Sequence, residues 1–299
     1  MTLNNTLYPL IYMLLFGATV VGLLWWQKRQ RKTRLPFGEE TKLCRQPGET
    51  LLNQVRKSDE EEPIHLLWAS CVPALLGLSV LILAARLPKA LVLPGAAVAV
   101  LVFLVTYWLA ARWMARRAQE NGNRHLGYFG ERIVADHLEP LKRAGWYIFH
   151  DVPGQSNGTK FNVDHVAVGP QGVFAIETKT RRKGNARPGF DDHKVYFDGQ
   201  VLIWPWGEDN HGLEQAERNA LWLAETIRAD LGERFHVSPV LTLPGWWVEQ
   251  KPSRQARLAR VTNPKGLAKF LPSGSAVLSD KQIAAIAAKL DARCRDVQF

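Results

Sequence analysis

Two acidic residues and one lysine stand in neighbouring β-rich runs of the sequence. Asp164 lies in the first run, and Glu177 and Lys179 lie in the second, which follows the turn-forming residues 169–172. Side chains two positions apart on a strand share a face, so Glu177 and Lys179 project together, and pairing of the two strands can bring Asp164 beside them. Carboxylate oxygens of this kind bind divalent cations, while a lysine can steady an attacking water or the charge on a phosphate.

The same three residues also fit a structural ion-pair cluster, because an acid two positions before a lysine is common on solvated strand faces. The surrounding helices favour the chemical interpretation. Residues 127–138 have helical spacing with Glu131 in the first turn, and residues 213–224 form a second amphipathic segment with Gln215 near its start. We therefore expect Glu131 and Gln215 to meet the other three side chains at one end of a sheet.

These motifs resemble those of the nuclease-related domain NERD, a distant branch of the PD-(D/E)xK nucleases. The matching segments, in chain order within residues 124–245, are 130–131, 162–165, 172–179 and 215–216. The resemblance implies an α/β fold with a restriction-endonuclease-like mixed sheet flanked by helices. It implies hydrolysis of phosphodiester bonds in nucleic acid, with DNA as the expected substrate and Mg²⁺ or Mn²⁺ as the cofactor.

The resemblance also implies roles for the five polar residues. Asp164 and Glu177 would bind the metal, and Lys179 would be the catalytic lysine. Glu131 and Gln215 would be supporting catalytic positions. The three central residues are all present, so nothing in this sequence argues for an inactive site.

Basic residues cluster directly after the second motif strand. The candidates for nucleic-acid binding are Arg181, Arg182, Lys183 and Arg187. Trp204 and Trp206 follow, and they fit either base stacking or the core of a hairpin. The formal net charge of +10 suits a nucleic-acid substrate but does not demonstrate one.

Three apolar stretches predict a membrane protein. Residues 8–26 are uncharged and are followed by the basic run 27–34, so we expect the amino terminus outside and this basic run in the cytoplasm. Residues 65–85 and 90–111 predict a transmembrane hairpin. The expected location is the inner (cytoplasmic) membrane, with multiple passes and the nuclease-like domain in the cytoplasm.

The turn of this hairpin contains Arg86 and Lys89, two positive charges on the predicted outer side. A re-entrant hairpin is the alternative, and it would also deliver the carboxyl-terminal domain to the cytoplasm. Cys44, Cys71 and Cys294 are widely separated, without Cys or His spacing for zinc, which agrees with a reducing interior.

The sequence divides into five expected parts. These are a transmembrane anchor (1–26), a cytoplasmic charged linker (27–63), a transmembrane hairpin (64–117), the NERD domain (118–275) and a carboxyl-terminal helix (276–299). The expected partners are nucleic acid, the lipid bilayer and a homo-oligomer or membrane assembly. Two other classes remain open: a non-catalytic tethered scaffold that binds nucleic acid or protein, and a component of a membrane transport assembly.

Overall fold

The computed structural model describes residues 3–30, 42–251 and 257–297, which divide into two units. The sheet unit comprises Thr41–Arg56 and Gly122–Phe299, and the apolar unit comprises Met1–Glu40 and Lys57–Asn121. The sheet unit is thus discontinuous in sequence, with most of the apolar unit inserted between its two segments.

A mixed five-stranded sheet organises the sheet unit. Its strands, in spatial order, are β10 (Arg260–Thr262), β8 (Val237–Thr242), β4 (Gly172–Thr178), β3 (Thr159–Gly169) and β2 (Tyr147–Ser156). β10, β8 and β4 run parallel, whereas β4, β3 and β2 pair antiparallel. Gly169 pairs with Gly172 across the turn, so the structure contains the hairpin expected between the two motif strands.

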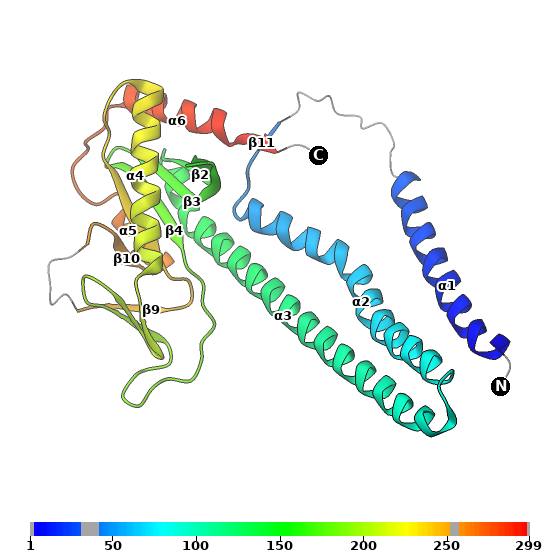
Figure 1. The fold of residues 1–299 in the computed structure, drawn as a ribbon. Helices are drawn as coiled ribbons and strands as arrows, with labels where there is room; N and C mark the ends of the chain where they lie inside the picture. The colour runs from blue at the N-terminus through cyan, green and yellow to red at the C-terminus, as the bar shows by residue number, and fades with distance from the viewer. Residues whose placement is uncertain (1–2, 31–41, 252–256, 298–299) are drawn as a thin grey trace. The chain divides into compact units, whose positions relative to one another are not determined.

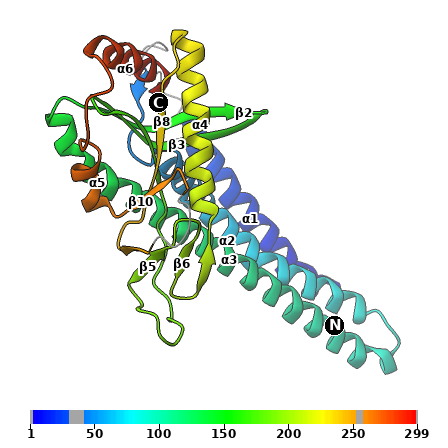
Figure 2. The same cartoon turned by 90° about the vertical axis from the view of Figure 1, so that its left-hand side faces the viewer.

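Helices cover both faces of this sheet (Figures 1 and 2). Against one face pack α4 (His211–Leu231) and α6 (Asp280–Cys294), with Val173, Ala175 and Leu223 in their shared core. Against the other face pack α5 (Pro264–Phe270) and the carboxyl-terminal part of α3 (Lys89–Arg143). The expected mixed α/β class is therefore present, with helices on both faces of the sheet.

A second, smaller sheet is inserted between β4 and α4 and is completed by a later strand. Its order is β7 (Gly207–Asp209), β6 (Leu202–Trp204), β5 (Lys194–Phe197) and β9 (Trp247–Gln250). Trp204, Trp246 and Leu202 are buried in its core together with Leu213 from the start of α4. The small sheet therefore packs against the helix that carries Gln215.

Part of the expected linker 27–63 belongs to the sheet unit. Strand β1 (Leu43–Cys44) pairs antiparallel with β11 (Arg295–Val297), and α2 (Glu49–Ala84) begins within this same unit. The boundary expected at residue 117 falls inside α3. The expected separate helix 276–299 corresponds to α6 and β11, and α6 contributes Ile286 to the main core, so this segment is integral to the sheet unit.

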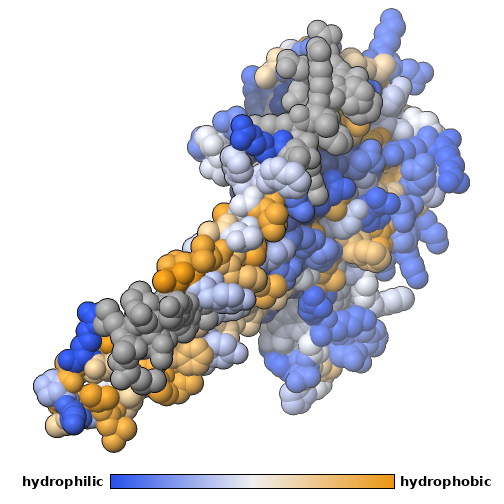
Figure 3. Space-filling view, turned by 90° about the vertical axis from the view of Figure 1, so that its right-hand side faces the viewer, coloured by the Kyte–Doolittle hydropathy of each residue, from blue (hydrophilic) through white to orange (hydrophobic). Residues whose placement is uncertain are grey.

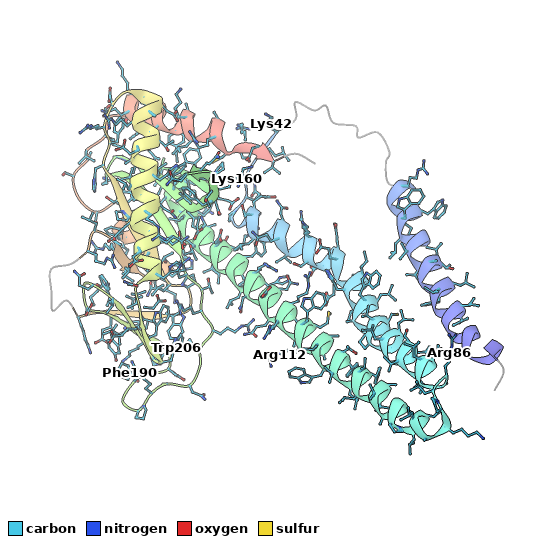
Figure 4. All side chains as sticks on the ribbon, in the orientation of Figure 1. Lys42, Arg86, Arg112, Lys160, Phe190 and Trp206 are labelled. Carbon is cyan, nitrogen blue, oxygen red and sulfur yellow. The ribbon has the colours of Figure 1, made fainter. Side chains whose placement is uncertain are left out.

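In the apolar unit, α2 and α3 form a helical hairpin with Arg86 in its turn (Figure 4). Small residues allow close helix contact, since a Cβ on Gly77 would lie 2.8 Å from Cβ of Phe103. Both helices are long and apolar enough to cross a membrane by length and composition. Their apolar side chains are mostly exposed, and Figure 3 shows them gathered along the hairpin.

The structure contains two such candidate helices among its described residues, where the sequence predicted three spans. The first predicted span lies in α1 (Leu3–Gln30), whose described apolar stretch, Leu14–Gln27, is shorter than the other two. Of the basic run that follows it, residues 31–34 lie outside the described part of the chain.

Candidate active site

Lys179 is held between two side chains at the end of β4. Its Nζ lies 2.7 Å from Oε1 of Glu177 and donates to Oε1 of Gln215 at 2.9 Å. Glu177 lies on the same face of β4 as Val173 and Ala175, which pack against α4, so strand periodicity directs its carboxylate toward that helix. The expected approach of Glu177, Lys179 and Gln215 is thus present in the structure.

Asp164 joins this group from the neighbouring strand. Its Oδ2 accepts a hydrogen bond of 2.7 Å from the backbone N–H of Thr178, which lies between Glu177 and Lys179. The antiparallel pairing of β3 with β4 brings the two segments together. The carboxyl group is buried and is close enough to Glu177 and Glu131 to feel their charges.

Asn219 is a buried neighbour that the sequence reasoning did not select. Its Nδ2 donates to Oε2 of Glu177 at 2.8 Å, so both carboxylate oxygens of Glu177 accept hydrogen bonds from side chains. The available signal was its spacing, since Asn219 lies four residues after Gln215 and therefore on the same face of α4. The helix presents two amide side chains to the end of β4.

Glu131 reaches the group from α3. It is buried, it accepts a hydrogen bond from the backbone N–H of Gly48, and its Oε2 has no partner among the described residues. The preceding residue, Gly130, allows α3 to approach the end of β4, because a Cβ there would overlap Oγ1 of Thr180. Glu131 thus stands at the edge of the cluster with one oxygen unused.

Burial raises the pKa of all three carboxyl groups and is the largest cause for each. Burial and the charges of Asp151 and Glu177 together raise the pKa of Glu131 to about 8. Burial and the charges of Glu177 and Glu131 raise the pKa of Asp164 well above its usual value. One ammonium therefore does not balance the acidic groups around it.

Burial lowers the pKa of Lys179, but the charge and hydrogen bond of Glu177, with help from Asp164 and Glu131, more than offset this effect. The net shift is upward, so the side chain remains a cation. For Glu177, burial raises the pKa and outweighs the opposing influence of Lys179 and Asn219. A second cation at the site would relieve this excess of buried negative charge.

The described residues contain no ready-made group of three or more His, Cys, Asp and Glu side chains arranged to hold a metal ion. Mg²⁺ is commonly bound by one or two carboxylates, with waters and substrate phosphates as the other ligands. Asp164 and Glu177 fit that mode, and the unpartnered oxygen of Glu131 and the excess acidity agree with it. The residues present are thus compatible with the expected metal.

Residues 126–244 match the family model described as Nuclease-related domain, NERD. The chain carries a NERD domain. The match begins within α3 and ends shortly after β8, so it contains all five polar residues of the cluster but neither Gly48 nor α6. Comparisons with curated proteins and with solved structures gave no significant match.

The four basic residues of the NERD domain expected to bind nucleic acid fall into two pairs. Arg181 forms an ion pair with Asp209, and Arg187 donates to the carbonyl oxygens of Trp204 and Pro205, so both are engaged by the small sheet. Arg182 and Lys183 are exposed, as is Arg187, but Arg182 donates to the carbonyl oxygen of Gly122 and Nζ of Lys183 lies over the ring of Trp246. The first pair is therefore distinguished by its polar contacts with the small sheet, and three of the four side chains are exposed to solvent.

The two tryptophans near the small sheet differ in their exposure to solvent. Trp204 is buried, whereas Trp206 is 37% exposed and stacks on Trp204 with ring centroids 5.6 Å apart. Figure 4 shows Trp206 on this part of the NERD domain. Trp204 is thus a core residue, and only Trp206 presents substantial surface to a ligand.

Proposed function

We propose that this protein is a membrane-anchored nuclease that hydrolyses phosphodiester bonds of nucleic acid, with DNA as the expected substrate and Mg²⁺ or Mn²⁺ as the cofactor. The observation that carries the proposal is the position of Lys179, whose ammonium contacts Glu177 and Gln215 beside Asp164. This arrangement lies within the segment that matches the nuclease-related family.

In the proposed reaction, Asp164 and Glu177 hold the metal ion, which supplies Lewis acidity at the phosphate when bound. Lys179 positions the attacking water and stabilises the charge that develops on the phosphate oxygens. The water oxygen bonds to phosphorus and releases a proton to solvent, the bond to the leaving ester oxygen breaks, and the leaving oxygen takes up a proton from solvent. Gln215 orients Lys179, Asn219 orients Glu177, and Glu131 supports the site.

Arg182 and Lys183 would contact the phosphate backbone, because they are exposed and lie three and four positions after Lys179. Arg181 and Arg187 would act indirectly by holding the small sheet. Trp206 would offer a stacking surface where strands are separated. The proposed core is restriction-endonuclease-like, in agreement with its mixed sheet and flanking helices.

The location is also proposed. The exposed apolar surfaces of α2 and α3 support a hairpin in the inner membrane. α1 would add a third span, with the amino terminus outside and the NERD domain in the cytoplasm. Further association into a homo-oligomer or a membrane assembly is compatible with this arrangement.

Replacing Lys179 tests the reaction. We expect Lys179→Ala in the full-length protein to abolish cleavage, because the only cation contacting Glu177 among the described residues is removed. Cleavage of plasmid, linear and single-stranded DNA and of RNA is measured with Mg²⁺, Mn²⁺ or chelator. Lys289→Ala is the matched control, since Lys289 is exposed on α6. Circular dichroism verifies that both variants fold.

The metal role has its own readout. Asp164→Ala should weaken binding of Mn²⁺ in calorimetric titration, because it removes one of the two proposed carboxylate ligands. Unchanged cleavage by Lys179→Ala would eliminate the proposed mechanism. Binding of nucleic acid without cleavage under every condition would instead favour a tethered scaffold.

One observation favours that second function. Glu177, Lys179, Gln215 and Asn219 already satisfy one another through short hydrogen bonds, as a purely structural ion-pair network would. A scaffold of this kind would retain nucleic-acid binding after Lys179→Ala but lose it when Arg182 and Lys183 are replaced. The same pair of variants therefore separates the two functions.

A further inference from the structure

Residues 43–50, here called the strap, lie beside the part of α3 that carries Glu131. They belong to the sheet unit although they lie far outside the NERD match. The strap begins in β1, which pairs with β11, and ends at the first turn of α2. Its contacts were not visible in the sequence, where this stretch resembles a charged linker.

Asp151 of β2 fixes both ends of the strap. Its fully buried carboxylate accepts hydrogen bonds of 2.7 Å from Nη1 of Arg45 and 2.7 Å from Oγ1 of Thr50, and a weaker one from the backbone N–H of Thr50. Asn162 donates to the other carboxylate oxygen. Charge-assisted bonds to a buried carboxylate are among the stronger polar contacts in proteins, so the strap is firmly held.

Asp151 has a backbone φ of +49°, a conformation that is uncommon for residues other than glycine. Such a conformation persists only where the surroundings impose it. Here the bonds from Arg45, Thr50 and Asn162 surround its side chain. The unfavourable backbone conformation of Asp151 therefore occurs at the residue that attaches the strap to β2.

The middle of the strap contacts Glu131. The backbone N–H of Gly48 donates to the Glu131 carboxylate, leaving Oε2 of Glu131 without a partner among the described residues. Gly48 has φ +70°, and a Cβ at this position would lie 2.7 Å from Cδ2 of Tyr128. Both the conformation and the close packing require glycine, and together they place the N–H against α3.

We propose that the strap is a positioning element of the active site, in which Gly48 orients the Glu131 carboxylate and the bonds of Arg45 and Thr50 to Asp151 hold Gly48 in place. The proposal rests on the proposed nuclease function, and it extends the functional unit beyond the NERD match. The strap contacts the Glu131 carboxylate, and Oε2 of Glu131 remains without a partner among the described residues. The catalytic unit is therefore assembled from segments on both sides of the apolar hairpin.

A double-mutant cycle in the full-length protein tests the connection between Gly48 and Glu131. We expect Gly48→Ala to lower kcat by about 10-fold to 100-fold, as small misplacements at active sites do, with KM changed less than about twofold. Glu131→Gln should lower kcat as well. Because Gly48 acts through Glu131, the double variant should be no slower than Glu131→Gln alone. If the kcat losses of the two single variants multiply in the double variant, the strap acts independently of Glu131 and the proposal is overturned.

Hydrogen–deuterium exchange supplies a readout that does not depend on activity. Arg45→Ala should raise exchange in peptides covering residues 43–50 and 128–134, whereas Asp296→Asn should not. Asp296 is the matched control because it is the exposed ion-pair partner of the same arginine. If the wild-type protein cuts no substrate, the proposed function fails while exchange still tests the strap. Unchanged protection at residues 128–134 in Arg45→Ala would refute the positioning role.

Discussion

At the scale of single residues, several buried polar groups in this protein are paired with other polar side chains. His150 and His165 are an example outside the carboxylate cluster, with their Nδ1 atoms 2.8 Å apart on paired strands. One ring must donate and the other accept, so a second proton on the accepting ring, at its Nδ1, would break the bond. His165 therefore belongs to a structural pair with His150.

This pair predicts a pH dependence of stability. Burial, together with Lys142 and Arg132, lowers the pKa of His150 to about 3. The folded protein thus binds fewer protons than the unfolded chain, whose histidine pKa is about 6.5, and stability falls as the pH drops below that value. At pH 5 we expect a loss of about 2 kcal/mol from His150 relative to neutral pH.

Unfolding by urea, followed by tryptophan fluorescence at pH 5 to 7, measures this loss. His150→Gln should flatten the pH dependence, because the titrating group is gone, while the exposed His193→Gln should not. Equal slopes for wild type and His150→Gln would contradict the assignment. Effects of the carboxyl groups are common to all three proteins and cancel in the comparison.

Strand periodicity and the family resemblance were sufficient to select the residues at the end of β4. Period two placed Glu177 and Lys179 on one face, and the hairpin turn placed Asp164 on the adjoining strand. Asn219 and Gly48 were not found. Asn219 is an amide without a motif of its own, and Gly48 acts through its backbone and lies 83 positions before Glu131, a separation that no local pattern bridges.

At the scale of elements, α4 connects the two sheets. Its first turns pack Leu213 and Ala216 into the core of the small sheet, and its later turns pack Leu223 and Ile227 against the main sheet. Gln215 and Asn219 lie between these contacts and point to the end of β4. The helix therefore fixes the small sheet and its basic residues relative to Lys179.

Replacing the basic residues that follow β4 should have two different effects, one on nucleic-acid binding and one on stability. Replacing Arg182 and Lys183 together with alanine should weaken nucleic-acid binding and reduce the slope of log affinity against log salt by about 2, since each phosphate contact contributes about 0.9. Arg181→Ala and Arg187→Ala should mainly lower thermal stability, because these side chains bind Asp209 and backbone carbonyls.

Fluorescence anisotropy with short DNA strands and duplexes, over a range of salt concentrations, measures the slopes. A Lys179→Ala background prevents cleavage during the titration, and Lys289→Ala provides a control for loss of one exposed charge. An unchanged slope in the Arg182, Lys183 double variant would remove both residues from the proposed interface.

At the scale of the whole molecule, the apolar hairpin is continuous in sequence with the sheet unit, since α2 and α3 each extend from one unit into the other. Near the polar end of the hairpin, Asp59 accepts from Asn121 at 3.0 Å, and Glu61 lies 3.5 Å from Arg117. Acidic residues of the expected charged linker thus contribute contacts between the helices. Sequence patterns identified the apolar stretches but not the extent of the helices, because helical spacing continues into polar residues.

The same hairpin leads to a testable prediction of the membrane topology. A protease site inserted after Leu87, in the turn, should be cut from outside intact cells if both helices cross the membrane. A site inserted after Asn157, in the exposed turn of the β2–β3 hairpin, should be cut only after permeabilisation. Immunoblotting detects the fragments. Protection of the first site in intact cells would favour the re-entrant hairpin, and external cleavage of the second would exclude a cytoplasmic domain.

The pairing of β1 with β11 also determines the order of events during synthesis. Arg45 and its partner Asp296 are 251 residues apart in the chain, so at about 5 to 20 residues per second the strap waits roughly 10 to 50 s for the strand that completes it. The apolar stretches emerge from the ribosome within that interval. In the proposed membrane-anchored nuclease, insertion into the bilayer would therefore precede the pairing of β1 with β11, and the chain would reach the membrane before its proposed active site is complete.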